Sequence, residues 1–297
     1  MTSTGRAKPM AYLAALRPRQ WVKNVFVFAA LVFAGRLGDA TAVGLAFAAF
    51  AVFCALASAV YLINDLRDRD ADRLHPVKRH RPIAAGEIAP AGAAVLSVVL
   101  AVAALLAAFR ISGALGLAAA AYFVLNFAYS FGLKRVVILD VMMVAAGFLL
   151  RAWAGALVLN VEISHWLVLC TGLLALFLGF VKRRQEIEAL NGATASRPIL
   201  REYSLPFLDQ MIGVVTGATV VAYALYAFSP EVAQKLGTQH LGLTIPFVLF
   251  GIFRYLYLVH QRGQGENPAA VMLADLPLML DIALWGVAVV IALYVWR

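Results

Sequence analysis

The residues with the clearest chemical potential form an acidic run from Asn64 to Asp72, at the end of a long apolar segment. If the run is helical, Asn64, Asp68 and Asp72 fall four residues apart and project from one face, with Asp65 beside that face. Carboxylates gathered in one patch repel one another, and a hard divalent cation relieves that repulsion. Mg²⁺ prefers oxygen ligands and is usually shared between one or two carboxylates and substrate phosphates. The spacing therefore predicts that Asn64, Asp65, Asp68 and Asp72 hold Mg²⁺ on a diphosphate, with the three aspartates as catalytic groups.

The same run also fits a solvated charged loop. Arg67, Arg69 and Arg73 alternate with the aspartates and could neutralise them without any metal. The loop that follows adds three further cations close to the carboxylates, and such cations would suit a polyphosphate whose charge exceeds what Mg²⁺ neutralises. Attraction to anionic lipid headgroups, worth about 1 kcal/mol per cation, would also explain them. We expect at least one of these three cations to contact substrate: Lys78, Arg79 and Arg81.

The elements that position these groups must lie in a membrane. Of the 297 residues, 63% are hydrophobic and 14% are charged, whereas soluble domains have about 45–50% apolar and about 25% charged residues. The apolar runs are about 20 residues long, enough for a helix to cross a hydrocarbon core of roughly 30 Å, and they lack the alternation of membrane strands. The sequence predicts an all-α polytopic membrane protein, with residues 1–297 as one integral domain. Nine spans are expected near residues 22–37, 41–63, 91–109, 112–131, 136–158, 164–181, 208–228, 241–259 and 275–296.

The distribution of lysine and arginine predicts the orientation. With these nine spans, twenty such residues fall on the side of the N-terminus and four on the other. Because basic loops stay in the cytoplasm, we expect the N-terminus and the charged loops there and the C-terminus outside. Residues 1–20 are expected to form a basic tail and an interfacial segment. The net charge of +9 is then a property of one membrane face, and no nucleic-acid-binding signature accompanies it. No nucleic-acid partner is expected, and a homo-oligomer is compatible with the sequence.

Two cations lie deeper than the loops. Lys23 follows Trp21 at the membrane entry and could face an internal cavity, where it would touch an anionic substrate. Arg151 lies in the middle of an expected span. An unpaired charge there is expensive, so Arg151 should face the helix bundle and find either a ligand or a structural partner, such as a salt bridge or a carbonyl group.

A resemblance becomes specific once these motifs are combined. Asn-Asp-x-x-Asp-x-x-x-Asp at residues 64–72, followed by Lys78-x-x-Arg81-Pro82, resembles the first signature of the UbiA superfamily of intramembrane prenyltransferases. The stretch 129–135, with Tyr129 and Lys134, falls where that family has its Tyr-x-x-x-Lys element. The resemblance covers nearly the whole chain. It implies a bundle of nine transmembrane helices with the active site at the cytoplasmic side, where aspartates hold a diphosphate through Mg²⁺.

The chain departs from the family at the second acidic motif. The prenyltransferases usually have a second Asp-x-x-x-Asp pair, and here only Asp140 is present, whereas basic groups stand at 134–135 and 182–184. Together with Arg-Pro-x-Gln-Trp-x-Lys-Asn at 17–24, this pattern resembles the branch that transfers phosphoribose from phosphoribosyl diphosphate (PRPP) to a polyprenyl phosphate such as decaprenyl phosphate, for cell-wall arabinan and arabinogalactan synthesis.

Phosphate counting favours this branch. A prenyl diphosphate has one charged end, whereas PRPP has two and the acceptor lipid adds a third phosphate. Mg²⁺ can serve one of these, so several cation clusters on cytoplasmic loops suit the demand, although positive-inside bias also places cations there. A conventional prenyltransferase with an aromatic or haem-like acceptor is the first alternative. A transporter or lipid flippase is the second, although we find no internal repeat typical of transporters. The residues expected to bind the substrates are Lys23, Asn64, Lys78, Arg79, Arg81, Tyr129, Lys134, Arg135, Asp140, Lys182, Arg183 and Arg184.

Overall fold

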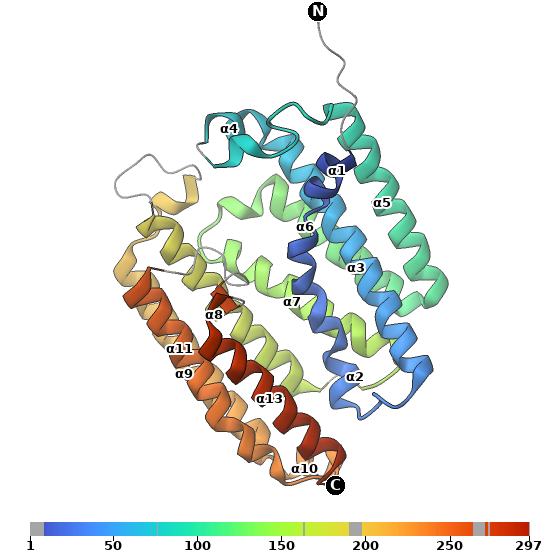
Figure 1. The fold of residues 1–297 in the computed structure, drawn as a ribbon, viewed down its shortest axis with the longest axis vertical. Helices are drawn as coiled ribbons and strands as arrows, with labels where there is room; N and C mark the ends of the chain where they lie inside the picture. The colour runs from blue at the N-terminus through green and yellow to red at the C-terminus, as the bar shows by residue number, and fades with distance from the viewer. Residues whose placement is uncertain are drawn as a thin grey trace, which may run out of the picture.

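The computed structural model describes residues 9–75, 77–162, 164–189, 198–263, 271–272 and 274–296, and within these ranges the chain forms α-helices and 3₁₀-helices and no strand. The expected all-α class is therefore confirmed. Eight of the described helices are long and apolar enough to cross a membrane, and in Figure 1 the long helices run side by side along the bundle. They are α3 (Ala40–Arg67), α5 (Pro90–Ile111), α6 (Gly113–Phe131), α7 (Leu139–Val158), α8 (His165–Glu188), α9 (Leu205–Phe228), α11 (Ile245–Arg262, after the 3₁₀ turn η5, His240–Thr244) and α13 (Leu276–Tyr294).

The first expected span, 22–37, is not among these eight helices, so the count of nine is not confirmed. The chain there forms an 11-residue 3₁₀-helix, η1 (Pro18–Phe28), and a five-residue helix, α2 (Ala29–Phe33). Because a 3₁₀-helix rises about 2.0 Å per residue and an α-helix about 1.5 Å, the two pieces together reach about 30 Å. In Figure 1 they run beside α3 from α1 (Pro9–Leu16) to the opposite end of the bundle. The segment is thus long enough to cross the hydrocarbon core without being a regular α-helix.

A glycine contact holds η1 against α7. A Cβ atom at Gly155 of α7 would overlap the carbonyl oxygen of Val27 in η1, so only glycine fits. The neighbouring Ala154 and Ala156 are small and fully or almost fully buried, as is Val27. This close approach places the middle of η1, including Asn24, directly on the face of α7.

Short elements connect the long helices at the end of the bundle where α1 and α4 lie (Figure 1). Helix α8 continues to Glu188, beyond the expected end at 181, so residues 182–184 lie in its last turns and not in a loop. Ser112 caps α6 and Ser204 caps α9, each accepting a hydrogen bond from a backbone N–H of the first turn. The short elements are α4 (Arg69–Leu74), η2 (Lys78–His80), η3 (Leu133–Arg135), η4 (Pro198–Arg201) and, at the other end, α10 (Pro230–Leu236).

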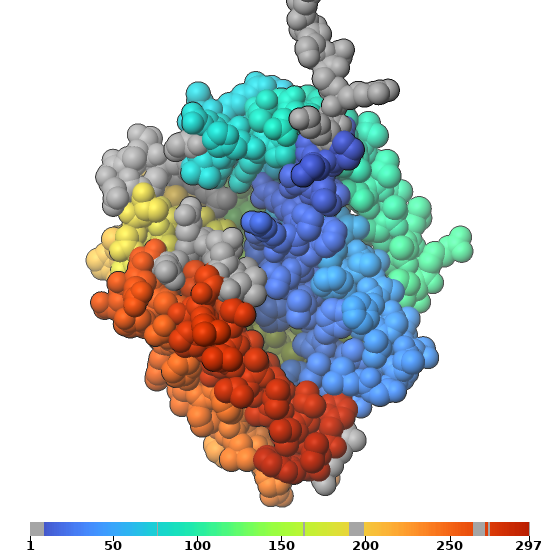
Figure 2. Space-filling model, in the orientation of Figure 1, coloured from blue at the N-terminus to red at the C-terminus, as the bar shows by residue number. Residues whose placement is uncertain are grey.

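The buried side chains divide into two main clusters. One joins η1 and α2 with α3, α5, α6 and α7, and the other joins α8 and α9 with α11 and α13. Figure 2 shows the molecule hollowed between the blue segments η1 and α2 and the red helix α13. Many large apolar side chains on the outer faces of α5, α9 and α13 are exposed, as a lipid-facing surface requires.

Candidate active site

The acidic run lies at a kink between two helices. Helix α3 ends at Arg67, Asp68 stands between the helices, and α4 begins at Arg69. Backbone hydrogen bonds nevertheless continue across the kink, from Asp68 N to Asn64 O at 2.9 Å and from Asp72 N to Asp68 O at 2.7 Å. The four-residue spacing therefore survives in near-helical form, and the run is not an unstructured loop.

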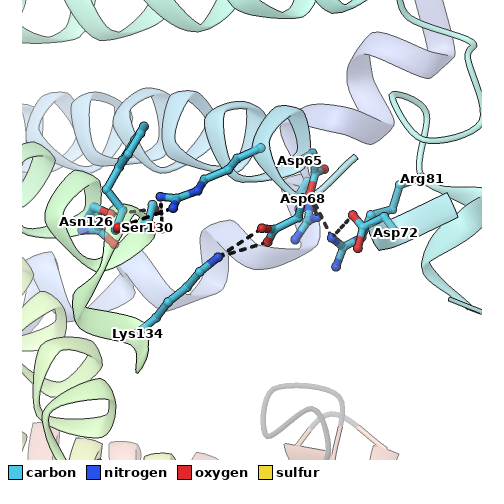
Figure 3. A network of polar contacts seen from close by, with 10 residues as sticks. Asp65, Asp68, Asp72, Arg81, Asn126, Ser130 and Lys134 are labelled. Atoms are coloured by element: carbon cyan, nitrogen blue, oxygen red, sulfur yellow. Dashed lines mark hydrogen bonds and ion pairs between the residues drawn. The ribbon is translucent and has the colours of Figure 1, made fainter. Parts of the chain in front are cut away.

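Asp65 and Asp72 are joined by one arginine. Both carboxylates are almost fully buried, with 2% and 4% of the residue exposed. The NH1 nitrogen of Arg81 lies 3.0 Å from Oδ1 of Asp65 and 2.7 Å from Oδ2 of Asp72 (Figure 3). Arg17 donates a second charged hydrogen bond to Asp65, at 2.6 Å. A side-chain cation thus already stands where a cation shared by the two acids would lie.

Asp68 is bound by Lys134, which belongs to the 129–135 motif. Lys134, in η3, donates to both of its carboxylate oxygens, at 3.1 and 3.3 Å (Figure 3). The side chain of Asp68 is 40% exposed, so its oxygens stay accessible. Arg67 ties the end of α3 to the end of α6, because its guanidinium donates to the carbonyl oxygens of Ser130 and Phe131.

The donors around the kink suit a metal that is shared with a substrate. Within the described residues, no three His, Cys, Asp or Glu side chains form a group that could hold a metal. Mg²⁺ at phosphate sites commonly takes only one or two carboxylates and completes its shell with phosphates and water. The accessible oxygens of Asp68, and the pair Asp65–Asp72 around its bridging cation, offer such ligands. Asn64 is half-buried one turn before Asp68, where its amide oxygen can add to this set.

Asp140 lies in a second cluster of different character. It is fully buried, and Oδ2 accepts from Nε of Arg183 while Oδ1 accepts from the hydroxyl of Tyr203, both at 2.6 Å. Arg183 also donates to Glu186 at 2.5 Å and to the hydroxyl of Tyr129 at 3.2 Å. Burial raises the pKa of Tyr203 and the hydrogen bond to Asp140 raises it further, so the phenol keeps its proton and acts as donor. A buried ion pair thus stands where the prenyltransferases usually have a second acidic pair.

The remaining predicted cations are distributed around these clusters. Arg184 pairs with Asp209 and Glu188, at 2.5 and 2.7 Å, and Lys182 lies 3.9 Å from Glu186. Arg135 is exposed beside Lys134 and makes no ion pair with a described residue. Lys78 and Arg79 lie in η2, just before Arg81, and Lys23 is half-buried on η1.

The sequence interpretation missed two residues of these clusters. Arg17 had a sufficient explanation as a membrane anchor, yet it contacts Asp65. Tyr203 lies in a polar segment where nothing specified chemistry, yet its hydroxyl holds Asp140 and also accepts a hydrogen bond from the backbone N–H of Ile138. Membership of the 17–24 motif was the sequence feature that could have indicated a role for Arg17. No sequence feature indicated one for Tyr203.

Comparisons with known proteins identify the family of the chain. The model of the UbiA prenyltransferase family matches residues 24–276. The decaprenyl-phosphate phosphoribosyltransferase of Mycolicibacterium smegmatis is 36% identical over 294 residues, covering 95% of this chain and 92% of that protein. The protein of the same name from Corynebacterium glutamicum is 37% identical over 292 residues, covering 95% and 86%.

The fold has been seen in solved structures as well. A UbiA homolog from Archaeoglobus fulgidus, bound to DMAPP and Mg²⁺, superposes with a TM-score of 0.73 over 94% of this chain and 99% of that one, at 21% identity. This likeness concerns the fold, and the apolar helices agree with an integral membrane protein. By the match of the family model and the identity to its relatives over almost the whole chain, this protein belongs to the UbiA prenyltransferase family.

Proposed function

We propose that this chain transfers 5-phosphoribose from PRPP to a polyprenyl phosphate and releases diphosphate. Two relatives named decaprenyl-phosphate phosphoribosyltransferase, 36% and 37% identical over 95% of the chain, support this reaction. The structural observation that carries it is the meeting of two motifs, in which Lys134 contacts Asp68 while Arg81 bridges Asp65 and Asp72. Oxygen ligands and cations therefore gather at one end of the bundle, as a diphosphate requires. The bias of lysine and arginine favours the cytoplasm for this end.

The donor's diphosphate would bind between the acids and their cations. Mg²⁺ held by Asn64, Asp65, Asp68 and Asp72 would neutralise charge on the leaving diphosphate. Lys134 and Arg81 have long side chains, and their charged ends would exchange the carboxylates for phosphate oxygens when the donor binds, since both partners offer charge-assisted hydrogen bonds. We assign the 5-phosphate to the exposed Arg135 and to the basic end of α8.

The transfer requires little covalent chemistry from the protein. The bond between C1 of the ribose and the diphosphate oxygen breaks, and its electron pair leaves with the diphosphate. An oxygen of the lipid phosphate forms the new bond to C1. Because a phosphate monoester is anionic near neutral pH, no general base is needed, and catalysis depends on positioning and on electrostatic stabilisation of the leaving group.

The second cluster favours this reaction over prenyl transfer. Asp140 is neutralised by Arg183 and hydrogen-bonded by Tyr203, so it is not available as half of a second acidic pair for another metal. A donor with phosphates at both ends also accounts for basic groups at two places, around Lys134 and at the end of α8. A prenyl diphosphate would use only one of them.

The direct test is a transfer assay with purified protein, polyprenyl phosphate, Mg²⁺ and radiolabelled PRPP. We expect label to move into the organic phase, to stop when the metal is chelated, and to persist when unlabelled prenyl diphosphate is added. Consumption of prenyl diphosphate without any transfer from PRPP would replace this proposal with a prenyltransferase. Turnover in detergent, with no second compartment, would exclude a purely transporting protein.

A further inference from the structure

Arg151 of α7 is a buried cation whose contacts are all neutral. The residue is 6% exposed. Its Nε donates to Oδ1 of Asn24 at 2.6 Å and its NH2 donates to the hydroxyl of Tyr122 at 2.7 Å. The guanidinium also lies over the rings of Tyr122 and Phe148, at 4.7 and 5.2 Å from their centroids. Within the described residues its hydrogen-bond partners are the two neutral side chains of Asn24 and Tyr122, and no carboxylate forms an ion pair with it. A charge at membrane depth is normally paired or marks the path of a ligand.

A second cation lies beside it. Lys23 is half-buried on η1 and directly precedes Asn24, the residue that accepts the hydrogen bond from Arg151. The amide of Asn24 is fixed from its other side, because its Nδ2 lies 3.2 Å from the sulfur of Cys54. The backbone of η1 is fixed by its contact with Gly155. The fold thus holds two neighbouring cations that form no ion pair with any carboxylate of the described residues, an arrangement that an anion would stabilise.

The two cations lie on the membrane side of the carboxylates. The side chain of Arg151 points back along α7, since its NH1 is 3.3 Å from where a Cβ atom of Gly147 would be. Gly147 comes seven residues after Asp140, which at 1.5 Å per residue places the guanidinium about 10 Å deeper than the start of α7. Lys23 lies on η1, six residues after Arg17, and Arg17 is the residue at the start of η1 that contacts Asp65. A group bound by Lys23 and Arg151 would therefore sit below the diphosphate, toward the bilayer.

We propose that Lys23 and Arg151 form the subsite for the phosphate monoester of the acceptor lipid. This assignment rests on the proposed phosphoribosyl transfer. A phosphate monoester carries about −1.5 to −2 charges at neutral pH, which two cations match. If the acceptor oxygen attacks C1 from the face opposite the departing diphosphate, the acceptor must lie on the membrane side of the ribose, where Lys23 and Arg151 are. We place the apolar tail in the hollow between η1 and α13 (Figure 2).

The test separates acceptor binding from catalysis. We would measure the binding of farnesyl phosphate and of farnesol to the full-length protein in detergent, and the KM values for polyprenyl phosphate and PRPP. The variants are Lys23→Gln, Arg151→Gln and Arg151→Lys. The matched control is Arg110→Gln, which changes an exposed arginine near the end of α5. We expect Lys23→Gln and Arg151→Gln to weaken farnesyl phosphate binding and to raise the acceptor KM tenfold or more, with Arg151→Lys intermediate. PRPP KM, farnesol binding and the control should stay within twofold of wild type.

Two results would overturn the subsite. One is a Lys23→Gln protein, folded by its unfolding temperature, with unchanged farnesyl phosphate binding and acceptor KM. The other is loss of PRPP affinity in place of acceptor affinity, which would assign the two cations to the donor. Lys23→Gln decides the matter even if Arg151→Gln does not fold. Farnesyl phosphate binding needs no turnover, so it is measured independently of the reaction. Binding that depends on Lys23 in a protein that transfers no phosphoribose would contradict the proposed reaction and still support the anion subsite.

Discussion

The ammonium group of Lys134 donates to both carboxylate oxygens of Asp68, at 3.1 and 3.3 Å, although 66 residues separate them in the chain. The contact joins η3 to the kink between α3 and α4, so the two motifs of the sequence meet in one place. Both side chains are partly exposed, at 23% and 40%, and a pair of this kind contributes about 0–1 kcal/mol to stability. The arrangement is therefore better explained by binding, since both groups can exchange partners with a phosphate and its metal.

Replacing Asp68 should abolish the metal-dependent reaction. We expect Asp68→Asn to lower kcat/KM about 100-fold or more in the PRPP transfer assay, because a neutral amide binds Mg²⁺ poorly and stabilises the leaving group less. The matched control is Asp70→Asn, which changes a 77% exposed carboxylate whose ion pairs with described residues are those to Arg69 and Arg73. Transfer that survives Asp68→Asn but still stops on chelation would keep the reaction and place the metal elsewhere.

Removing the charge of Lys134 should weaken donor binding. A hydrogen bond to a charged group contributes about 1.5–3 kcal/mol, so Lys134→Gln should raise the KM for PRPP about tenfold or more while changing the acceptor KM little. Steady-state kinetics with one substrate varied at a time would measure this. Lys235→Gln is the control, because Lys235 pairs with Glu162 in an exposed bridge remote in sequence from both motifs. An unchanged PRPP KM would mean that Lys134 serves only to position Asp68.

The pair Asp140–Arg183 should matter for stability as well as for the site. Removing one partner of a buried ion pair costs about 3–5 kcal/mol when the other charge is left unpaired. Arg183 keeps its bridge to Glu186, so the cost of Asp140→Asn should lie at the low end of that range. We therefore expect Asp140→Asn to lower the unfolding temperature in detergent strongly. Tyr203→Phe removes the hydrogen bond to the same carboxylate together with the one that the hydroxyl accepts from the backbone N–H of Ile138, and each should cost about 1–3 kcal/mol.

A double-mutant cycle would separate the pair from its surroundings. The variant Asp140→Asn/Arg183→Gln should be more stable than the sum of the two single changes, since neither buried charge then lacks its partner. Additive effects of the two changes would contradict a direct interaction in the membrane.

Hydropathy predicted the long helices well, because a segment that crosses the membrane must be apolar over most of its length. The expected spans 91–109 and 112–131 correspond to α5 (Pro90–Ile111) and α6 (Gly113–Phe131), within two residues at each end. It did not predict that the first span would be a 3₁₀-helix, since that geometry depends on a partner, Gly155, 128 residues after Val27 in the chain. It also ended α8 at 181, because the basic and acidic turn after that point is helical but not apolar.

Motif spacing predicted which groups gather at the site, but not their partners. The spacing of the acidic run predicted that Asp65, Asp68 and Asp72 lie together, and the structure places them around the kink between α3 and α4. Arg17 and Arg81 neutralise Asp65. These contacts depend on the tertiary structure and could not be predicted from the local sequence. In the same way, the position of Arg151 in a span required some partner. Only the packing of η1 and α6 on α7 decides that its partners are neutral groups, Asn24 and Tyr122.

Acid should weaken one ion pair outside the site. Arg254 donates two hydrogen bonds to Asp275, at 3.1 and 2.8 Å, and these hold the pKa of Asp275 below its usual value of 3.8. A lowered carboxyl pKa adds stability above the unfolded-state pKa, and this stability is lost as the pH falls through the folded-state pKa. Asp275→Asn keeps an N-cap side chain for α13 and removes only the charge. Its deficit in unfolding temperature at pH 7 should therefore shrink toward pH 3, and a constant deficit would contradict this.

Filling the contact between η1 and α7 should disturb the site from a distance. A Cβ atom at Gly155 would overlap the carbonyl oxygen of Val27, so Gly155→Ala must push η1 away, at about 1–3 kcal/mol for overpacking. The shift would move Asn24 off Arg151, and we expect a lower unfolding temperature together with a raised KM for the acceptor lipid. The control is Gly213→Ala on α9, where nothing lies within 4 Å of the added carbon; the better helix propensity of alanine should leave it as stable as wild type or more so. Equal unfolding temperatures for the two variants would show that η1 tolerates displacement, and the acceptor KM would then reveal whether Lys23 and Asn24 need their position on α7.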